Sequence, residues 1–334
     1  MNMARLERWM QANRWVWSGM AVLILWFILS VVTNRFSIAS LSGIALSASF
    51  LTIVGIGQMF VVTTGRGNID LSIPSVITLN AYIALLTIRC VDANLLFGLP
   101  ITVGLGVAIG ILNALLVVVL RIPAIIATLA TGYIFATATL LANRAIPGFM
   151  ISPIVKNIAS GRFFGVPIMA LVALLFVIVA SFVLRRTAYG HALSAVGQNQ
   201  TAAKLAGVNT GLVTATAFIV SSVLASLTGV FLGAYVGGAF LDMGQAYLLQ
   251  SIASVVVGGT LIFGGSATAL GTMLASVLLV LIVTTMQIMG LPPGTQDMVQ
   301  GIVVILVLAL AGRQFVARRP KHAKEAAPPD AQKA

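Results

Sequence analysis

A single acidic side chain stands beside the apolar segments of this chain. Asp70 lies in the stretch 65–75, GRGNIDLSIPS, directly before a long apolar run, whereas the other acids lie in evident loops or tails. An ionised aspartate at the centre of a bilayer costs about 2.5–3.5 kcal/mol, so this position needs a reason. Asp70 and Ser72 are helix-start residues, and Pro74 is tolerated in a first turn. Asp70 is thus either a cap, paired with Arg66, or part of a translocation path or its inner gate.

The longest stretch without membrane character between the first and last apolar segments is 185–210, RRTAYGHALSAVGQNQTAAKLAGVNT. Asn199 or Thr201 can cap a short helix there, and Gly207 can end it. Such a helix, held off the bilayer by an apolar segment on each side, offers a surface to another protein. The alternative is an ordinary basic cytoplasmic loop. Its basic residues are Arg185, Arg186, His191 and Lys204.

The sequence lacks the residue groups that nucleotide, disulfide or metal chemistry requires. No G-x4-G-K-[ST] phosphate loop occurs, so we expect the chain not to hydrolyse ATP itself. Cys90 is the only cysteine, which excludes an internal disulfide and is too little for a cysteine metal site. His191 and His322 lie in a loop and a tail with no acidic cluster nearby. We expect no catalytic residue, no metal and no cofactor in this chain.

Membrane helices must position these residues. Of the 334 residues, 59% are hydrophobic and 8% are charged, whereas soluble domains carry about 25% charged residues. Taking about 20 apolar residues per span, we predict an all-α polytopic membrane protein of ten spans, in two halves of five, with both termini in the cytoplasm. The first span is interpreted as uncleaved, since no small-residue cleavage site follows it. The predicted spans are 15–33, 43–64, 69–88, 95–120, 123–142, 166–184, 210–235, 246–263, 268–289 and 297–312.

Basic residues set the orientation, because cytoplasmic segments carry the excess of Lys and Arg. With the N-terminus inside, fourteen of the 19 Lys and Arg residues are cytoplasmic and five are external. The net charge of +12 therefore indicates a membrane rather than a nucleic-acid partner. The predicted organisation is a cytoplasmic segment 1–14, a transmembrane domain 15–312 that contains the loop 185–210, and a disordered basic cytoplasmic tail 313–334.

Each predicted half contains a glycine-rich polar interruption, at 65–72 and at 258–271. Paired interruptions are typical of the internal repeats of transporters. The external loop 143–165 is broken up by proline and glycine, and residues 154–158 could form a short amphipathic turn on the membrane surface. This loop is either a platform for an external binding protein or a solvated connector.

Three stretches carry a family resemblance. Residues 190–208 reproduce G-x4-A-x-G-x-N-x2-A-A-x3-G-[IV], residues 65–75 resemble G-G-I-D-L-S-x-G-S, and residues 251–272 resemble A-x2-V-x-G-G-T-x3-G-G-x-G-x3-G-T. The patterns are similar to those of ABC-importer permeases of the ribose and monosaccharide class, within the branched-chain amino acid and ribose permease group. The resemblance covers nearly the whole chain outside the two tails. The departures from the patterns are Arg66, Asn68, Pro74, Gln198 and Ala267.

The resemblance implies a multi-pass permease of the bacterial inner membrane that imports a monosaccharide or related polyol. It implies that a separate ATP-binding subunit, which holds ATP and Mg²⁺, docks on the loop 185–210. A periplasmic binding protein would deliver the cargo, and a second permease copy or a sister permease would complete the path. The alternative is an ion-coupled secondary transporter that uses Asp70. The residues assigned to the coupling loop are Gly190, Gly197, Asn199, Thr201, Ala202, Ala203, Lys204 and Gly207.

Polar side chains inside the spans are candidates for the translocation path, although such groups also bond neighbouring helices. Apart from Asp297 at the first position of the tenth span, the spans hold no other acid and no internal Lys or Arg, which favours a neutral polyhydroxyl cargo. The small residues of 251–272 favour close helix packing over contact with cargo. The path candidates are Gln58, Asp70, Ser72, Asn80, Asn113, Tyr133 and Gln250, with Thr128, Thr131 and Gln287 as further polar residues in spans.

Overall fold

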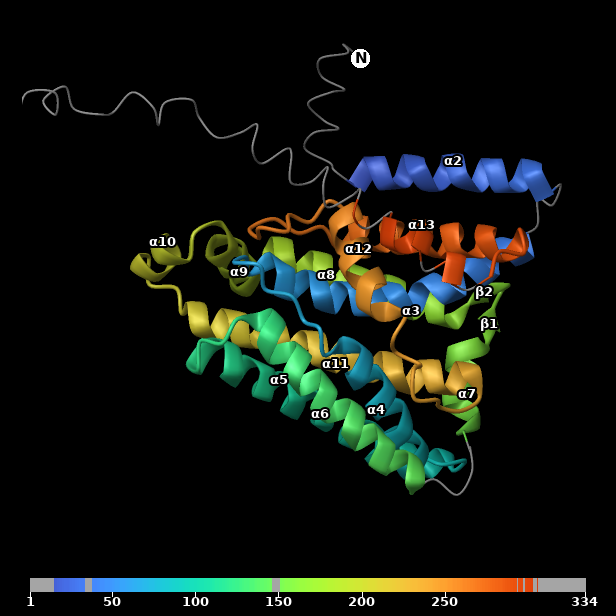
Figure 1. Ribbon diagram of the computed structural model, residues 1–334, viewed down its shortest axis with the longest axis horizontal. Helices are drawn as coiled ribbons and strands as arrows, with labels where there is room; N and C mark the ends of the chain where they lie inside the picture. The colour runs from blue at the N-terminus through green and yellow to red at the C-terminus, as the bar shows by residue number, and fades with distance from the viewer. Residues whose placement is uncertain are drawn as a thin grey trace, which may run out of the picture.

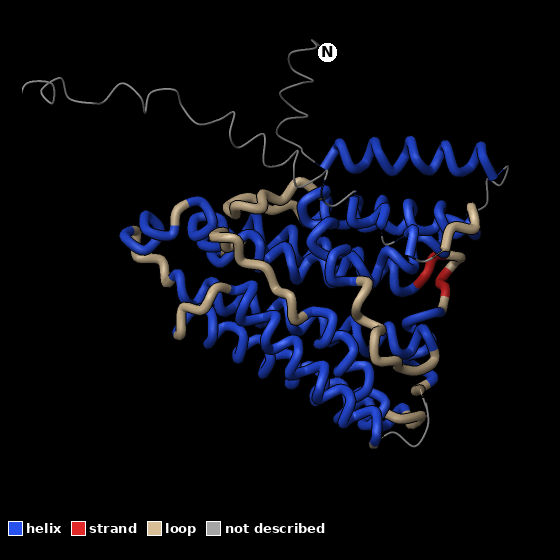
Figure 2. Tube along the Cα trace, in the orientation of Figure 1, coloured by secondary structure: helices blue, strands red, loops and turns tan. Residues whose placement is uncertain are grey.

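A computed structural model describes residues 15–33, 38–145, 151–292, 294–296, 298–302 and 305. Helices dominate this part of the chain, and its strands are the two of one short hairpin (Figure 2). The hairpin pairs β1 (Arg162–Phe163) antiparallel to β2 (Val166–Pro167). The longer helices are α2 (Trp15–Thr33), α3 (Ile38–Thr63), α4 (Ile73–Thr87), α5 (Leu95–Ala114), α6 (Ala124–Arg144), α8 (Ile168–Arg186), α11 (Thr210–Val236), α12 (Tyr247–Val257) and α13 (Ala269–Ile288). The shorter ones are η1 (Asp92–Asn94), the π-helix η2 (Leu115–Val119), α7 (Pro153–Ser160), α9 (Ala188–Gln198) and α10 (Gln200–Leu205).

Two central helices, α3 and α11, hold the bundle together. α3 packs against α8, α12 and α13, and α11 packs against α4, α5 and α3 itself. α2 lies outside α13, and α6 lies against α4 on the opposite side of the molecule (Figure 1). The central helices are mostly buried, whereas α5, α6 and α8 expose most of their apolar surface. Helices that are apolar all round and exposed in this way fit a bilayer.

Six helices of the described chain are long and apolar enough to cross a membrane, against ten predicted spans. They correspond to the second, fourth, fifth, sixth, seventh and ninth predictions. The described apolar helices at the first, third and eighth predictions are shorter, namely Trp15–Ile28, Ile73–Thr87 and Tyr247–Val257. The tenth prediction, 297–312, falls largely outside the described residues, as do the two predicted tails.

The third and eighth predictions, 69–88 and 246–263, extend too far because both include a non-helical segment. Residues 64–72 are non-helical up to the N-terminus of α4, where Pro74 occupies the first turn, and α12 ends at Val257. At 15 residues, α4 is about 22 Å long, which is less than the roughly 30 Å hydrocarbon core. Both interruptions run as loops between helices in Figure 2. The two predicted polar interruptions are thus real breaks in the helical structure.

The two ends of the bundle differ in character. α9 and α10 lie together at one end, and α7 and the hairpin lie at the other (Figure 1). α7 confirms the predicted amphipathic turn: Val155 and Ala159 are buried, and Ser152 caps the helix through the Val155 amide. Ser152 also donates a short hydrogen bond to Asp92. α7 is therefore attached to the bundle and is not a loose connector.

The one cysteine gives a direct test of the predicted orientation. Cys90 is free and exposed, and it directly precedes η1 at the α7 end. We expect a membrane-impermeant maleimide to label it in intact spheroplasts, because the predicted orientation places that end outside. In a Cys90→Ser background, Ala206→Cys at the exposed end of α10 should be labelled only after permeabilisation. Labelling of both positions from the same side would show that the predicted number of spans between them is wrong.

Candidate functional site

The stretch 185–210 folds into two short helices, of which the sequence predicts only the second. α9 begins at Ala188 and is capped by Thr187, whose Oγ1 accepts a hydrogen bond from the Gly190 amide at 3.2 Å. It packs closely on α8, since a Cβ atom at Gly190 would lie 2.2 Å from the Val183 carbonyl oxygen. The Tyr189 hydroxyl donates to the Val213 carbonyl oxygen at 3.4 Å, and burial raises the pKa of this hydroxyl. α9 is thereby fixed to α8 and to α11.

α10 is the predicted capped helix. The Asn199 side-chain oxygen accepts a hydrogen bond from the Ala202 amide at 3.0 Å, so Asn199 and not Thr201 is the cap. Gly207 follows the helix with φ +84°, a left-handed conformation that glycine adopts without strain. The predicted start and end of this helix are both confirmed.

The side chains of α10 divide into an inner and an outer face. Ala203 is 4% exposed and packs into the core of the chain, so it does not face a partner. Leu205 is 86% exposed. Residues two apart lie on nearly opposite sides of a helix, and this spacing is the signal by which Leu205 could have been found. The other exposed members of this outer face are Thr201, Ala202, Lys204 and Ala206.

The three motif stretches meet at the α9 end of the bundle. The Gly265 amide donates to the Thr63 carbonyl oxygen at 3.0 Å, and Gln198 Nε2 donates to the Gly265 carbonyl oxygen at 3.3 Å. The backbone contact leaves no space for a side chain at Gly197. A Cβ atom there would lie 2.0 Å from the Thr63 carbonyl oxygen and 2.3 Å from the Gly265 amide nitrogen. We call this contact of Thr63, Gly65, Gly197 and Gly265 the glycine junction. It joins the end of α9 to both broken segments through backbone atoms.

The third motif closes on itself. A Cβ atom at Gly271 would lie 1.9 Å from the Gly258 carbonyl oxygen, so the end of α12 and the start of α13 touch at the backbone. The Thr268 side chain caps α13 by accepting from the Gly271 amide at 2.8 Å. This contact agrees with the helix-packing interpretation of 251–272.

Asp70 is buried between α3 and α11, where its carboxylate accepts three hydrogen bonds. Oδ1 accepts from the Ser72 amide at 3.0 Å and from Ser72 Oγ at 2.6 Å, and Oδ2 accepts from Ser221 Oγ at 2.8 Å. Asp70 is 1% exposed. The expected Arg66 pair is absent from the described chain: Arg66 has φ +58° and donates to Gln200 Oε1 at 2.6 Å instead. Hydroxyl and amide groups, not a basic side chain, satisfy this carboxylate.

A polar network extends from Asp70 to the neighbouring helices. Ser72 Oγ accepts from Asn113 Nδ2 at 2.9 Å, and Asn113 Oδ1 accepts from Thr131 Oγ1 at 2.6 Å. The Leu71 amide donates to Thr128 Oγ1 at 2.9 Å. The Asp70 amide donates to Gln58 Oε1 at 3.3 Å. The network therefore joins α3, the start of α4, α5, α6 and α11.

Some polar atoms beside this network have no partner within the described chain. Gln58 Nε2 and Ser222 Oγ are buried and unpaired, and so is Asn80 Oδ1 on α4. Asn80 Nδ2 bonds only to its own helix, through the Val76 carbonyl oxygen at 2.9 Å. An unpaired buried polar group is costly, so such atoms are candidates for a bond to cargo or water.

The structure brings together only part of the predicted path. Gln58, Asp70, Ser72 and Asn113 share one network. Tyr133 lies outside it, 69% exposed on α6. Gln250 Nε2 donates to Gln300 Oε1 at 2.8 Å, and neither residue takes part in the hydrogen bonds of the network. Ser221 is a member that the sequence did not single out, because a serine within the apolar α11 carries no distinguishing pattern.

The arrangement offers hydrogen bonding and helix positioning rather than bond-making chemistry. Within the described residues, no group of His, Cys, Asp and Glu side chains could hold a metal ion. What the geometry does contain is a polar cluster among five elements and a rigid backbone contact that reaches from the broken segments to α9 and α10. Movement of those two helices would therefore be transmitted to both breaks.

Comparison with known proteins places this geometry in context. Residues 40–308 match the family described as "Branched-chain amino acid transport system / permease component". The chain is 30% identical over 312 residues to "Autoinducer 2 import system permease protein LsrC" of Yersinia pseudotuberculosis serotype O:1b (strain IP 31758), covering 92% of this chain and 87% of that protein. It is 29% identical over 334 residues to the protein of the same description from Salmonella typhi, covering 96% and 94%. No solved structure matches.

Proposed function

The chain belongs to the permease component family of branched-chain amino acid transport systems, and we propose that it forms the translocation path of an ABC importer for a sugar-like cargo. As a multi-pass permease of the inner membrane, it is a transport subunit and not an enzyme. ATP hydrolysis takes place on a partner ATPase. In the proposal, that ATPase holds the ATP and Mg²⁺ and docks on α9 and α10.

The observation that carries the proposal is the glycine junction. An importer must convert movement of an external ATPase into opening of the membrane path, which needs a stiff connection between the two. Here the end of α9 contacts Thr63, which adjoins the first broken segment, and Gly265, which lies within the second, through backbone atoms. Backbone contacts of this kind do not yield as flexible side chains do.

The polar network supports a neutral polyhydroxyl cargo. Apart from Asp70, its side chains carry amide and hydroxyl groups, and the Asp70 carboxyl group is already satisfied by its own donors. Unpaired Gln58 Nε2 and Ser222 Oγ are a donor and a hydroxyl that suit sugar-like hydroxyl groups. The related proteins are described as permeases for autoinducer 2 import, and we propose a small cargo of similar polarity.

The opposite end of the bundle is where we place delivery of the cargo. α7 is fixed by its buried face and by the Ser152–Asp92 hydrogen bond, and the hairpin beside it carries Phe164, which is 92% exposed. A periplasmic binding protein would contact this end. A second permease copy or a sister permease would complete the path.

The docking of the ATPase can be tested at Leu205. Leu205→Asp places a charge at the most exposed apolar side chain of α10, where binding would require its desolvation. We expect ATPase co-purification to weaken roughly thirtyfold, the effect of a hot-spot residue, and uptake to fall with it. Phe164→Asp is the matched control, because it makes the same change at the opposite end and should leave ATPase binding unchanged. Normal ATPase retention by Leu205→Asp would exclude α10 as the docking helix.

A further inference from the structure

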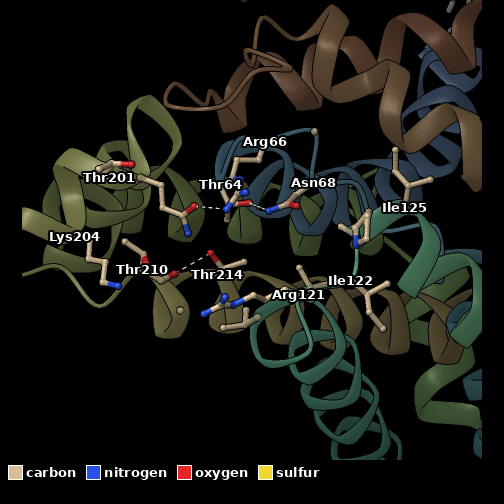
Figure 3. Close-up of a pocket in the computed structure, with 17 residues that line it drawn as sticks. Thr64, Arg66, Asn68, Arg121, Ile122, Ile125, Thr201, Lys204, Thr210 and Thr214 are labelled. Atoms are coloured by element: carbon tan, nitrogen blue, oxygen red, sulfur yellow. Dashed lines mark hydrogen bonds between the residues drawn. The ribbon is translucent and has the colours of Figure 1, made fainter.

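A cavity of about 910 Å³ lies beside α10, at the cytoplasmic end of the bundle (Figure 3). The first broken segment, the turn between η2 and α6, α10 and the start of α11 form its walls. It is distinct from the Asp70 network, because none of the hydrogen-bonding side chains around Asp70 lines it. The proposed transport of a neutral cargo does not account for the residues that line this cavity.

Three basic side chains line this cavity, and no acidic side chain among the described residues does. They are Arg66, Arg121 and Lys204, each from a different wall. Arg66 donates to Gln200 at 2.6 Å, while the side chains of Arg121 and Lys204 have no hydrogen-bond or ion-pair partner within the described chain. In Figure 3 the Arg121 and Lys204 side chains reach toward the same space from opposite sides. The cavity therefore has three positive charges, and the part of the chain that the structure describes supplies no anion to compensate them.

The backbone also holds two of these cations in an unfavourable conformation. Arg66 has φ +58° and Arg121 has φ +56°, in the left-handed region that non-glycine residues rarely adopt. Both lie in the short non-helical segments that face the cavity. Strain of this kind persists where the surrounding structure enforces it, and it is often found at ligand sites.

The cavity is amphipathic rather than only basic. Ile122 and Ile125 line it together with the cations. Ile125 is 45% exposed and begins an apolar stripe on α6 that continues through Ile126 at 60% and Leu129 at 42% exposed. A ligand held by the cations would thus have an apolar, outward-facing helix surface directly beside it.

We propose that this cavity binds the phosphate group of an anionic phospholipid of the inner leaflet, with the acyl chains along α6. Basic pockets between membrane helices on the cytoplasmic side are suited to such head groups. The proposal accounts for both features of the site, whereas an acidic segment of a protein partner would account for the charge and leave the apolar stripe unexplained. A small free anion would likewise account for the cations but not for the apolar stripe.

The test uses the full permease, purified without its ATPase. Reconstitution into vesicles of phosphatidylglycerol should raise the thermal midpoint of the permease. Phosphatidylglycerol molecules should also remain bound to the permease when it is extracted and washed with detergent, whereas phosphatidylcholine should have neither effect. In the double variant Arg121→Gln/Lys204→Gln, retention of phosphatidylglycerol should fall roughly thirtyfold. Each basic side chain near an anionic lipid increases the affinity about five- to sixfold, and two such factors multiply to this value. Arg185→Gln/Arg186→Gln is the matched control, because these exposed cytoplasmic cations lie outside the cavity.

Three outcomes would overturn the proposal. Unchanged lipid retention in the cavity variant would show that the lipid binds elsewhere. Equal stabilisation by inorganic phosphate alone would identify a small-anion site instead of a lipid site. In a second preparation, expressed together with the ATPase, loss of ATPase co-purification by the cavity variant with normal lipid retention would assign the cations to the protein partner. None of these results bears on whether the chain carries a sugar-like cargo, so the proposed function stands or falls separately.

Discussion

Replacing Gly197 with alanine should abolish uptake. The added methyl group would lie 2.0 Å from the Thr63 carbonyl oxygen and 2.3 Å from the Gly265 amide nitrogen. Real side-chain carbons do not approach backbone atoms so closely, and neither neighbour is a flexible side chain that could turn away. The end of α9 must therefore move off both broken segments, and the Gln198–Gly265 hydrogen bond is lost with it.

The expected phenotype is a specific loss of coupling. Leu205 lies on the outer face of α10, beyond the junction, so Gly197→Ala should still co-purify with the ATPase. We expect ATP-driven uptake in proteoliposomes of the whole importer to fall by about a hundredfold or more, which corresponds to roughly 3 kcal/mol of lost coupling. ATPase activity should continue without responding to cargo and binding protein.

A matched glycine separates this effect from a general intolerance of alanine. Gly104 lies in α5, and a Cβ atom there would meet no other atom within 4 Å. Gly104→Ala should leave uptake unchanged and should slightly favour the helix, because alanine is the better helix former. Normal, cargo-stimulated uptake by Gly197→Ala would show that the junction transmits nothing.

The sequence predicts those features of this fold that depend on neighbouring residues. Asn199 and Gly207 mark the start and the end of α10 correctly, because capping and left-handed turns are local effects. The lengths of α4 and α12 are predicted wrongly because the predicted spans run into the two polar interruptions, from residue 69 in the first and to residue 263 in the second. Apolar residues such as Ile69 and Leu71 occur within these segments, and composition alone does not distinguish a helix from a buried extended segment.

Contacts between distant residues are what the sequence does not provide. Arg66 lies four residues from Asp70, yet its left-handed backbone directs it to Gln200 on α10. Ala203 belongs to the correct helix, but its burial against the core depends on how that helix is seated. The partner of Asp70 on α11, Ser221, lies 151 positions away. Each of these facts follows from tertiary packing, which fixes the site without leaving a local pattern.

Asp70 separates the importer from the ion-coupled alternative. If the carboxylate is the centre of a structural network, Asp70→Ala should strongly destabilise the purified chain, since it leaves the Ser72 amide, Ser72 Oγ and Ser221 Oγ without their acceptor. A buried group that loses its partner costs about 1–3 kcal/mol. We expect a clear drop in the thermal midpoint and little assembled permease. Asp242→Asn, a change at an exposed acid, is the control and should leave the midpoint unchanged.

Asp70→Asn distinguishes the two mechanisms because it keeps the shape and one acceptor oxygen while it removes the charge. In an importer, the variant should lose stability moderately and keep part of its ATP-driven uptake, and the parent chain alone in liposomes should accumulate no cargo under a proton or sodium gradient. In an ion-coupled transporter, the parent chain alone would accumulate cargo under such a gradient, and Asp70→Asn would eliminate that uptake while the fold persisted. Because three donors already satisfy the Asp70 carboxyl oxygens and no basic side chain of the described chain pairs with them, we expect the first result.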